Sequence, residues 1–316
     1  MNHTLAALML GVLRSGESYL ISDLAARLDC RVTELREIKN ALQAQGVPVL
    51  EAGDNIQLGT TLPHLDREML HKVLLPYHAV IKVAVDSTNQ YILEHMAIFQ
   101  QGDVCLSDFQ FFGRGRRGRH WVSVYGGQIN LSMYWKLSSI ISANGLSLMV
   151  GLAVLDALYA LGYGKLSLKW PNDILYMGRK LGGILIETVS SNDKQGLPLV
   201  IGVGLDLIAP SSWQNKHADW ATLSEVQQEP DKNQLVVMIV DYLHEYLGIF
   251  EQQGFAYFRQ QWMQHDYYLG KRVKLISNSI LAQGIEHGVM DDGSLIIHTA
   301  QGQQCFQGGE ISLLEA

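Results

Sequence analysis

The sequence contains few cysteines and no cysteine pair. Three cysteines occur among its 316 residues, Cys30, Cys105 and Cys305, and none stands in a Cys-x-x-Cys spacing. A disulfide framework and the common cysteine zinc sites both need several cysteines at short spacings, so both are excluded. We therefore expect three buried structural thiols in a reducing compartment.

Long apolar runs and an excess of basic residues are also missing. The apolar stretch at residues 5–13 follows no basic segment, and its apolar positions recur with the spacing of an amphipathic helix rather than of a signal peptide. No run is long enough to cross a bilayer. The chain carries 24 Lys and Arg against 31 Asp and Glu, a net charge of −7, so no global positive field attracts nucleic acid or anionic membrane. We expect a cytoplasmic protein with no membrane partner.

Several common catalytic motifs are absent. The sequence has no GxxxxGK[ST] phosphate loop, no GxSxG elbow and no HExxH helix. Gly113, Gly115 and Gly118 do match the GxGxxG dinucleotide fingerprint. That fingerprint requires a following helix and an acid about 20 residues later. The segment that follows is strand-like, and no Asp or Glu occurs between residues 109 and 155, so the dinucleotide interpretation fails.

The first 62 residues predict three helices followed by a β-hairpin. Ser22 is a candidate N-cap for the second helix, and the third carries Leu35, Ile38 and Leu42 on one face. Residues 47–58 predict two strands around a Gly-Asp-Asn turn. This is the plan of a winged helix-turn-helix.

The charge of this segment argues against strong DNA binding. It contains five basic and seven acidic residues, and the candidate DNA contacts Arg31, Arg36 and Lys39 lie among acids. Because phosphate contacts dominate affinity for DNA, such a surface should bind weakly unless dimerisation doubles it. A DNA-binding domain and a domain kept for structure, or for shaping a ligand site elsewhere in the chain, both remain open.

The rest of the chain predicts a linker helix, an α/β domain and a small all-β domain. A helix capped by Asp66 falls within residues 63–79, and strand-like and helix-like segments alternate through residues 80–267. Residues 268–316 predict short strands separated by Asn, Asp-Gly and Gln-Gly turns, which favours an antiparallel barrel or sandwich. We expect domain boundaries near residues 62, 79 and 267.

Residues 113–121, GRGRRGRHW, are the most unusual segment of this acidic chain. Four arginines and three glycines stand within seven residues. Glycines let backbone N–H groups approach an anion, arginines supply forked donors for carboxylate or phosphate, and Trp121 offers a face for a base. A flexible nucleic-acid contact and a solvated loop without a role are the alternatives.

Two further clusters follow. Lys-Trp-Pro-Asn-Asp at residues 169–173 comes after an apolar strand, where Asn172 and Asp173 would bind ribose or Mg²⁺ beside phosphates. Taken alone, a simple turn is the more natural interpretation. In the third cluster, RKLGGIL at residues 179–185, adjacent glycines suit a strand that a ligand approaches closely. Lys180 would place a charge on a carboxylate or α-phosphate there, and a surface lysine beside a turn is the alternative.

Taken in this order, the clusters resemble the biotin protein ligases, especially the bacterial type with an N-terminal winged-helix biotin operon repressor domain. The resemblance rests on DSTN (86–89), GRGRRGRHW, KWPND, RKLGGIL, IGVGLDL (201–207) and the terminal GGEISL, and covers nearly the whole chain. It implies a mixed α/β (α+β) ligase domain of the biotin/lipoate ligase type with a C-terminal SH3-like β-barrel.

The resemblance also implies an activity and its residues. Such a ligase makes biotinyl-5′-AMP from biotin and ATP with Mg²⁺, then transfers biotin to a lysine of the biotin carboxyl carrier domain of acetyl-CoA carboxylase. By resemblance the biotin-binding residues are Ser87, Thr88, Gln110, Gly113, Arg114 and Lys180. Those for ATP and adenylate are Arg116, Arg119, Trp121 and Asn172, with Asp173 near Mg²⁺ and phosphates. Arg116, Lys180 and Asp173 would be catalytic, and Arg116 would keep the mixed anhydride from leaving early.

There are two departures from the family pattern, and two other functions stay open. Phe111-Phe112 precede Gly113 where the family usually has a smaller residue, and Asp206 stands where it commonly has Asn. The resemblance further implies operator DNA binding as an adenylate-loaded homodimer. The alternatives are a ligand-sensing DNA-binding regulator with weak catalysis and a lipoate or octanoate ligase, since those ligases share the fold.

Overall fold

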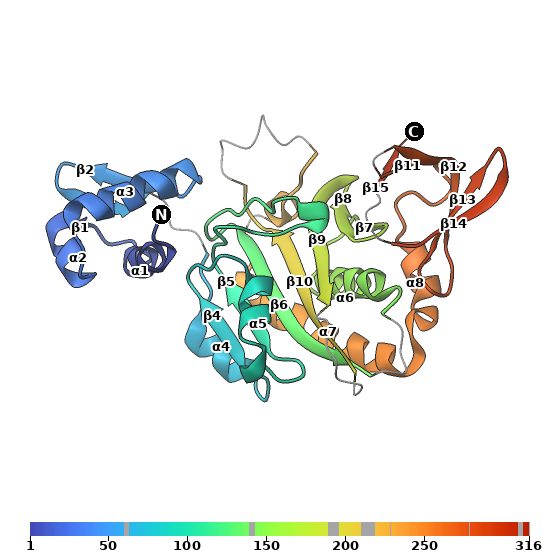
Figure 1. Ribbon diagram of the computed structural model, residues 1–316, viewed down its shortest axis with the longest axis horizontal. Helices are drawn as coiled ribbons and strands as arrows, with labels where there is room; N and C mark the ends of the chain where they lie inside the picture. The colour runs from blue at the N-terminus through green and yellow to red at the C-terminus, as the bar shows by residue number, and fades with distance from the viewer. Residues whose placement is uncertain are drawn as a thin grey trace.

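The computed structural model describes residues 1–59, 63–138, 143–188, 196–209, 219–227, 229–277, 279–308 and 312–315. Three units follow one another across the molecule: a small helical unit, a central sheet domain, and a second sheet that carries the C-terminus (Figure 1). None of the helices within these residues is long and apolar enough to cross a membrane.

The N-terminal unit is the predicted winged helix. Leu35, Ile38 and Leu42 form its buried core face, as expected. Ser22 is not the cap of the second helix: that helix starts one residue earlier at Ile21, after the N-cap Leu20. Ile21 is buried and its N–H donates to the carbonyl of Asp54 in the wing turn (2.8 Å), so tertiary contact sets the start. The elements are α1 (His3–Leu13), β1 (Tyr19–Leu20), α2 (Ile21–Arg27), α3 (Val32–Ala44), β2 (Val49–Ala52) and β3 (Asn55–Leu58).

A seven-stranded sheet forms the central domain, in the order β4-β5-β6-β10-β9-β8-β7. Only β4 and β5 run parallel; the other neighbouring pairs are antiparallel. The strands are β4 (Ala79–Lys82), β5 (Val104–Ser107), β6 (Gln128–Leu137), β7 (Leu166–Lys169), β8 (Asp173–Tyr176), β9 (Arg179–Thr188) and β10 (Leu197–Asp206). Strand β8 is one that the sequence analysis did not predict.

Helices cover both faces of this sheet. The long helices α6 (Leu146–Ala160) and α7 (Lys232–Gln253) pack together on one face, and α5 (Thr88–Glu94) lies on the other. Successive β10 side chains alternate accordingly: Ile201 and Val203 join the core beneath α6 and α7, while Val200 packs with Ile92 of α5. Helix α4 (Arg67–Val73) is capped by Asp66 as predicted, and α8 (Arg259–Gln264) was not predicted. Single 3₁₀ turns are η1 (Met96–Ile98), η2 (Arg116–Gly118), η4 (Leu223–Glu225) and η5 (Phe255–Tyr257).

The C-terminal unit is an antiparallel sheet in the order β14-β13-β12-β11-β15. This agrees with the short antiparallel strands predicted for residues 268–316, of which residues 278, 309–311 and 316 lie outside the described residues. Cys305 is exposed on the edge strand β14 and Cys30 is only partly buried, so the expectation of three buried thiols holds for Cys105 alone. The strands are β11 (Arg272–Ile276), β12 (Ile280–Val289), β13 (Leu295–Thr299), β14 (Gly302–Phe306) and β15 (Ser312–Glu315).

The chain between β5 and β6 forms a loop that is closed at its base. The N–H of Gly126 donates to the carbonyl of Asp108 (3.0 Å), which joins the two ends of this excursion. Lys232, the first residue of α7, reaches the same point: its Nζ lies 2.7 Å from Asp108 Oδ1 and 3.4 Å from the carbonyl of Gly126. The arginine-glycine segment lies within this loop.

Candidate functional site

A cavity of ≈ 800 Å³ lies on the α5 face of the central sheet. The arginine-glycine loop, the β7–β8 hairpin and the C-terminal sheet complete its walls. Three motifs that are far apart in sequence therefore meet in one place. The predicted residues that line the cavity are Ser87, Thr88, Gln110, Arg114, Arg116, Arg119, Trp121, Asn172, Asp173 and Lys180.

Gly113 is the one predicted residue that does not line the cavity. It is buried, and an added Cβ would come within 2.4 Å of the carbonyl oxygen of Trp121. Its own carbonyl accepts from the N–H of Trp121 (2.8 Å). Glycine is required here because the loop backbone at residue 113 lies close to the backbone at Trp121. This reason differs from the anion contact that we expected.

A buried hydrogen-bond network forms the α5 end of the cavity. The N–H and Oγ1 of Thr88 donate to Gln110 Oε1 (2.8 and 3.2 Å), and Gln110 Nε2 donates to Asn130 Oδ1 (2.9 Å). Ser132 Oγ lies 2.7 Å from Thr88 Oγ1. These side chains are held before any ligand arrives, so this end suits a neutral polar group. Asn130 and Ser132 were missed from the sequence, because only the pairing of β5 with β6 brings them here.

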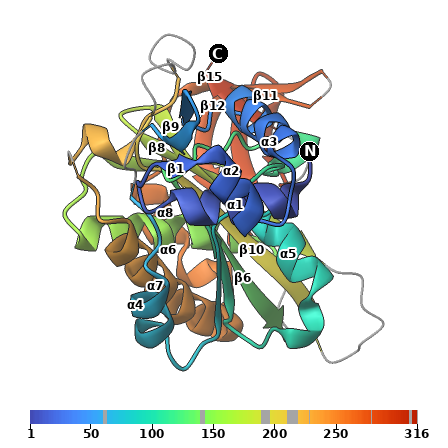
Figure 2. The same ribbon diagram turned by 90° about the vertical axis from the view of Figure 1, so that its left-hand side faces the viewer.

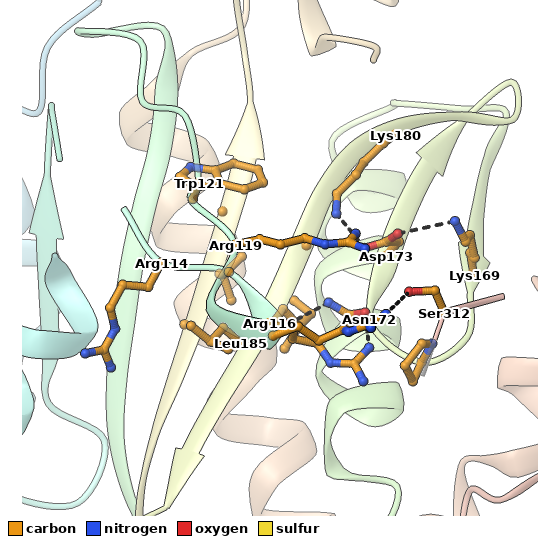
Figure 3. Close-up of a pocket in the computed structure, with 18 of the residues that line it drawn as sticks. Arg114, Arg116, Arg119, Trp121, Lys169, Asn172, Asp173, Lys180, Leu185 and Ser312 are labelled. Atoms are coloured by element: carbon orange, nitrogen blue, oxygen red, sulfur yellow. Dashed lines mark hydrogen bonds and ion pairs between the residues drawn. The ribbon is translucent and has the colours of Figure 1, made fainter. Parts of the chain in front are cut away.

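Arg114 lies at the α5 end of the cavity, apart from the other arginines of the loop that line it. Its guanidinium donates to Gln90 of α5 and to the Glu187 carboxylate on β9. The other Glu187 oxygen accepts from Asn89 Nδ2 (2.9 Å). Figure 3 shows Arg114 turned away from Arg116 and Arg119. Its charge is thus already paired.

The KWPND segment is both a turn and a wall of the site. It closes the β7–β8 hairpin, and Asp173 pairs with Lys169 across the two strands. Lys180 Nζ lies 2.7 Å and Lys169 Nζ 3.6 Å from the Asp173 carboxylate, so three motif residues form one charged cluster (Figure 3). Lys169 also lines the cavity, although we had not assigned it to the site.

Arg116 joins the loop to this hairpin. Its Nη1 donates to Asn172 Oδ1 (2.8 Å), and Asn172 exchanges two further bonds with Ile184 of β9 (2.9 Å each). Burial lowers the pKa of the Arg116 guanidinium, against the raising effect of Asp173. A partly desolvated cation that also feels the charges of Arg117 and Arg119 is well placed to attract a polyanion.

The next loop residue contacts the C-terminal sheet. Arg117 donates to the carbonyl of Ser277 (3.3 Å) and to Ser312 Oγ (3.4 Å). Both serines line the cavity. The C-terminal sheet is thus part of the site, which the sequence analysis did not anticipate.

Trp121 lies over a glycine of β10. An added Cβ on Gly204 would come within 2.7 Å of the indole atom Cζ2, so only glycine leaves room for this ring. The indole Nε1 is buried without a hydrogen-bond partner among the described residues. The ring and its donor therefore present a platform for a planar group.

Asp206 lies beneath the chain that follows Trp121. Its carboxylate accepts from Gln128 Nε2 (2.6 Å), and Gln128 also bonds the backbone of Val122 and Val124. Burial raises the pKa of Asp206 to about 7, although the Gln128 hydrogen bond and Lys180 lower it. The residue that departs from the family pattern is thus a structural support that does not line the cavity.

The three candidate DNA contacts each lie close to an acid. Arg31 pairs with Glu34 on the surface of α3 (3.2 Å). Arg36 and Lys39 both reach Glu51 of the wing strand β2, at 2.9 and 2.7 Å. The structure therefore brings these cations to one surface but partly neutralises them.

Comparison with known proteins agrees with this architecture. The Biotin/lipoate A/B protein ligase family model matches residues 80–206, and the Biotin protein ligase C terminal domain model matches residues 268–314. The bifunctional ligase/repressor BirA of Salmonella typhimurium is 32% identical over 99% of this chain and 98% of its own length, and that of Escherichia coli is 31% identical over 100% and 99%. A solved biotin protein ligase from Aquifex aeolicus, in complex with biotin and ATP, is 28% identical with a TM-score of 0.66, and the match covers 76% of this chain and 99% of that one. The chain belongs to the biotin protein ligase family.

Proposed function

We propose that this chain activates biotin with ATP and transfers it to a lysine of a biotin carrier domain, that of acetyl-CoA carboxylase in the first instance. A single observation carries the proposal: one cavity has a buried neutral network at one end and a cluster of cations at the other. The uncharged rings of biotin suit the first end, and a carboxylate meeting a triphosphate needs the second. The names of the ligase relatives support the same assignment.

In the first step a biotin carboxylate oxygen attacks the α-phosphorus of ATP, and the bond to pyrophosphate breaks. Both reactants are anionic, so Arg116 and Lys180 would lower their repulsion and stabilise charge on the α-phosphate. Ser87, Thr88, Gln110 and Arg114 would hold biotin, and Arg119, Trp121 and Asn172 the adenylate. Gly113, predicted among the biotin-binding residues, would serve by letting the loop close on itself at Trp121. Mg²⁺ would enter with the phosphates and neutralise their charge. Mg²⁺ often binds through one or two carboxylates and takes its other ligands from substrate phosphates and water, and Asp173 would supply such a carboxylate. Among the described residues there is no group of three or more His, Cys, Asp or Glu side chains that could hold a metal ion by themselves.

In the second step the carrier lysine attacks the anhydride carbonyl, and AMP leaves. No protein nucleophile is needed for this chemistry. Cys105 is buried, and burial raises the pKa of its thiol to about 12, so it does not supply one. The loop contacts from Arg116 and Arg117 would keep water from the intermediate.

The winged helix supports a second role, as a biotin-operon repressor. Two relatives named bifunctional ligase/repressors match 99% and 100% of this chain, so the match includes its N-terminal winged helix. Arg31, Arg36 and Lys39 would contact operator DNA in a homodimer loaded with biotinyl-adenylate. We further propose functional units at residues 1–62, 63–79, 80–267 and 268–316.

Biotin-dependent ATP–pyrophosphate exchange with Mg²⁺ tests the enzyme. The wild type should exchange with biotin and not with lipoate or octanoate, and Lys180→Ala should lose the exchange. Lys72→Ala, on the exposed last turn of α4, is the matched control and should keep it. Exchange with lipoate or octanoate alone would move the protein to those ligases. No exchange with any acid would leave a ligand-sensing regulator.

A further inference from the structure

Two segments that lead into the biotin end of the cavity are joined side by side. The N–H of Phe111 donates to the carbonyl of Val85 (2.9 Å), and the N–H of Phe112 donates to that of Asp86 (2.8 Å). Ser87 follows directly on the first segment. The arginine-glycine loop follows directly on the second. A shift of either segment would therefore move both walls of this end together.

One side chain from the winged helix touches both segments. His3, the first residue of α1, has its Nδ1 2.7 Å from Asp86 Oδ1. Its ring stacks on Phe111 with centroids 4.6 Å apart and planes within 14°, and meets the edge of Phe112 at 5.0 Å. The His3 side chain is 28% exposed, so most of its surface is used in these contacts.

The surrounding packing makes this contact part of a continuous core. Val83, Ala84 and Phe109 belong to the same buried cluster as the winged-helix residues Met9 and Leu13. Arg14, just after α1, donates to the carbonyl of Leu65 in the linker (2.9 Å). Seen from the winged-helix end, α1 lies over this side of the central domain (Figure 2). Helix α1 is therefore docked against the ligase domain at the ladder that holds the site.

We propose that His3 is a positioning residue of the ligase site, through which the winged helix holds the biotin-binding segments in place. Phe111 and Phe112, the departure from the family pattern noted above, form the surface that receives its ring. Because energetic coupling between two sites is reciprocal, biotin binding should in turn tighten the docking of α1. This inference rests on the proposed biotin ligase function and adds the contact that couples its two units.

Steady-state kinetics of His3 variants test the coupling. His3→Ala should raise the KM for biotin about three- to tenfold while kcat and the KM for ATP change less than about twofold. His3→Phe keeps a stacked ring without the Nδ1 contact to Asp86 and should recover part of the loss. His298→Ala removes a histidine stacked on His287 in the C-terminal sheet and serves as the matched control. If His3→Ala changed kcat, the KM for biotin and the KM for ATP by the same factor, or changed none of them, the proposal would be overturned.

Hydrogen exchange on the wild type gives a second measurement that does not depend on a variant that folds. Biotin should slow amide exchange in residues 3–13 of α1 as well as in residues 110–121. Protection of the loop alone would contradict the coupling but leave the ligase function standing. Protection of neither region, with no biotin-dependent pyrophosphate exchange, would instead contradict the proposed function.

Discussion

At the residue scale, two glycines of β10 let side chains from other elements reach the sheet. A Cβ on Gly202 would come within 2.4 Å of Asn89 Oδ1, and one on Gly204 would meet the Trp121 ring. Both positions face α5, so β10 itself offers no side chain there. At these two positions the floor of the cavity is backbone, onto which the helix and the loop bring their polar and aromatic groups.

The change Gly204→Ala should therefore displace the Trp121 indole. We expect a KM for ATP about tenfold higher with little change in the KM for biotin, because stacking of a base on an aromatic ring contributes about 1–3 kcal/mol. Pyrophosphate-exchange kinetics at varied ATP and varied biotin measure the two constants. Gly248→Ala, inside α7 with no atom within 4 Å of the added Cβ, is the control and should slightly stabilise the fold. An unchanged KM for ATP would contradict this role of Trp121.

Asp206 should make stability depend on pH. Burial raises its pKa in the folded protein from 3.8 to about 7. Between these values the folded state holds a proton that the unfolded state has lost, so stability falls as pH rises through this window and then levels off. Asp206→Asn lacks this proton. Urea denaturation should show the wild type losing about 2 kcal/mol relative to Asp206→Asn between pH 5 and pH 8. Parallel stability curves for the two proteins would refute the assignment.

At the scale of elements, the first residue of α7 secures the base of the arginine-glycine loop. The Lys232 ammonium and the Asp108 carboxylate are both almost fully buried and lie 2.7 Å apart. Lys232→Met would leave Asp108 buried without its partner, and we expect it to destabilise the protein by about 3–5 kcal/mol. The double variant Lys232→Met with Asp108→Asn should recover much of this loss. Denaturant unfolding of the wild type, Lys232→Met and the double variant measures their free energies of unfolding. An equal loss of stability in the single and double variants would argue against the pairing of Lys232 with Asp108.

The helices and strands also show which parts of the fold can be predicted from sequence patterns. The apolar face of the third N-terminal helix was predicted correctly, because the spacing of Leu35, Ile38 and Leu42 dictates which side is buried. Strand β8 was missed since it is four residues long and begins with Asp173, a poor strand former, directly after a turn. In the site, local motifs predicted the polar and charged residues that line the cavity from the arginine-glycine loop and the β7–β8 hairpin, with the exception of Arg117, His120 and Lys169. His3, Glu187 and Ser132 were not predicted, because each reaches the site only through sheet register or domain docking.

At the scale of the whole molecule, the winged helix presents few free cations to DNA. Glu51 holds both Arg36 and Lys39, and these contacts, Lys39 first, lower the pKa of its carboxyl group. Glu51→Gln should free both cations, so affinity for DNA should rise several-fold at low salt. The slope of log K against log salt should steepen by about 1–2, since each phosphate contact adds about one released counterion. Fluorescence anisotropy across a salt series measures both.

Asp54→Asn is the control for this prediction. It removes the same charge from the exposed tip of the wing and leaves the Arg36 and Lys39 contacts in place. If both variants steepen the slope equally, net charge rather than the release of paired cations governs binding.

The closed base of the loop between β5 and β6 allows the loop to move while the strands stay in place. Because Asp108 and Gly126 are tied to each other and to Lys232, and Gly113 is tied to Trp121, residues 114–120 can adopt another conformation without shifting the register of either strand. The loop can thus open over the cavity while the sheet keeps its structure. Opening should need far less free energy than unfolding of the sheet, so substrates enter and AMP leaves at the expense of a few loop contacts. A protein built this way can expose its reactive intermediate to the carrier lysine while its core stays intact.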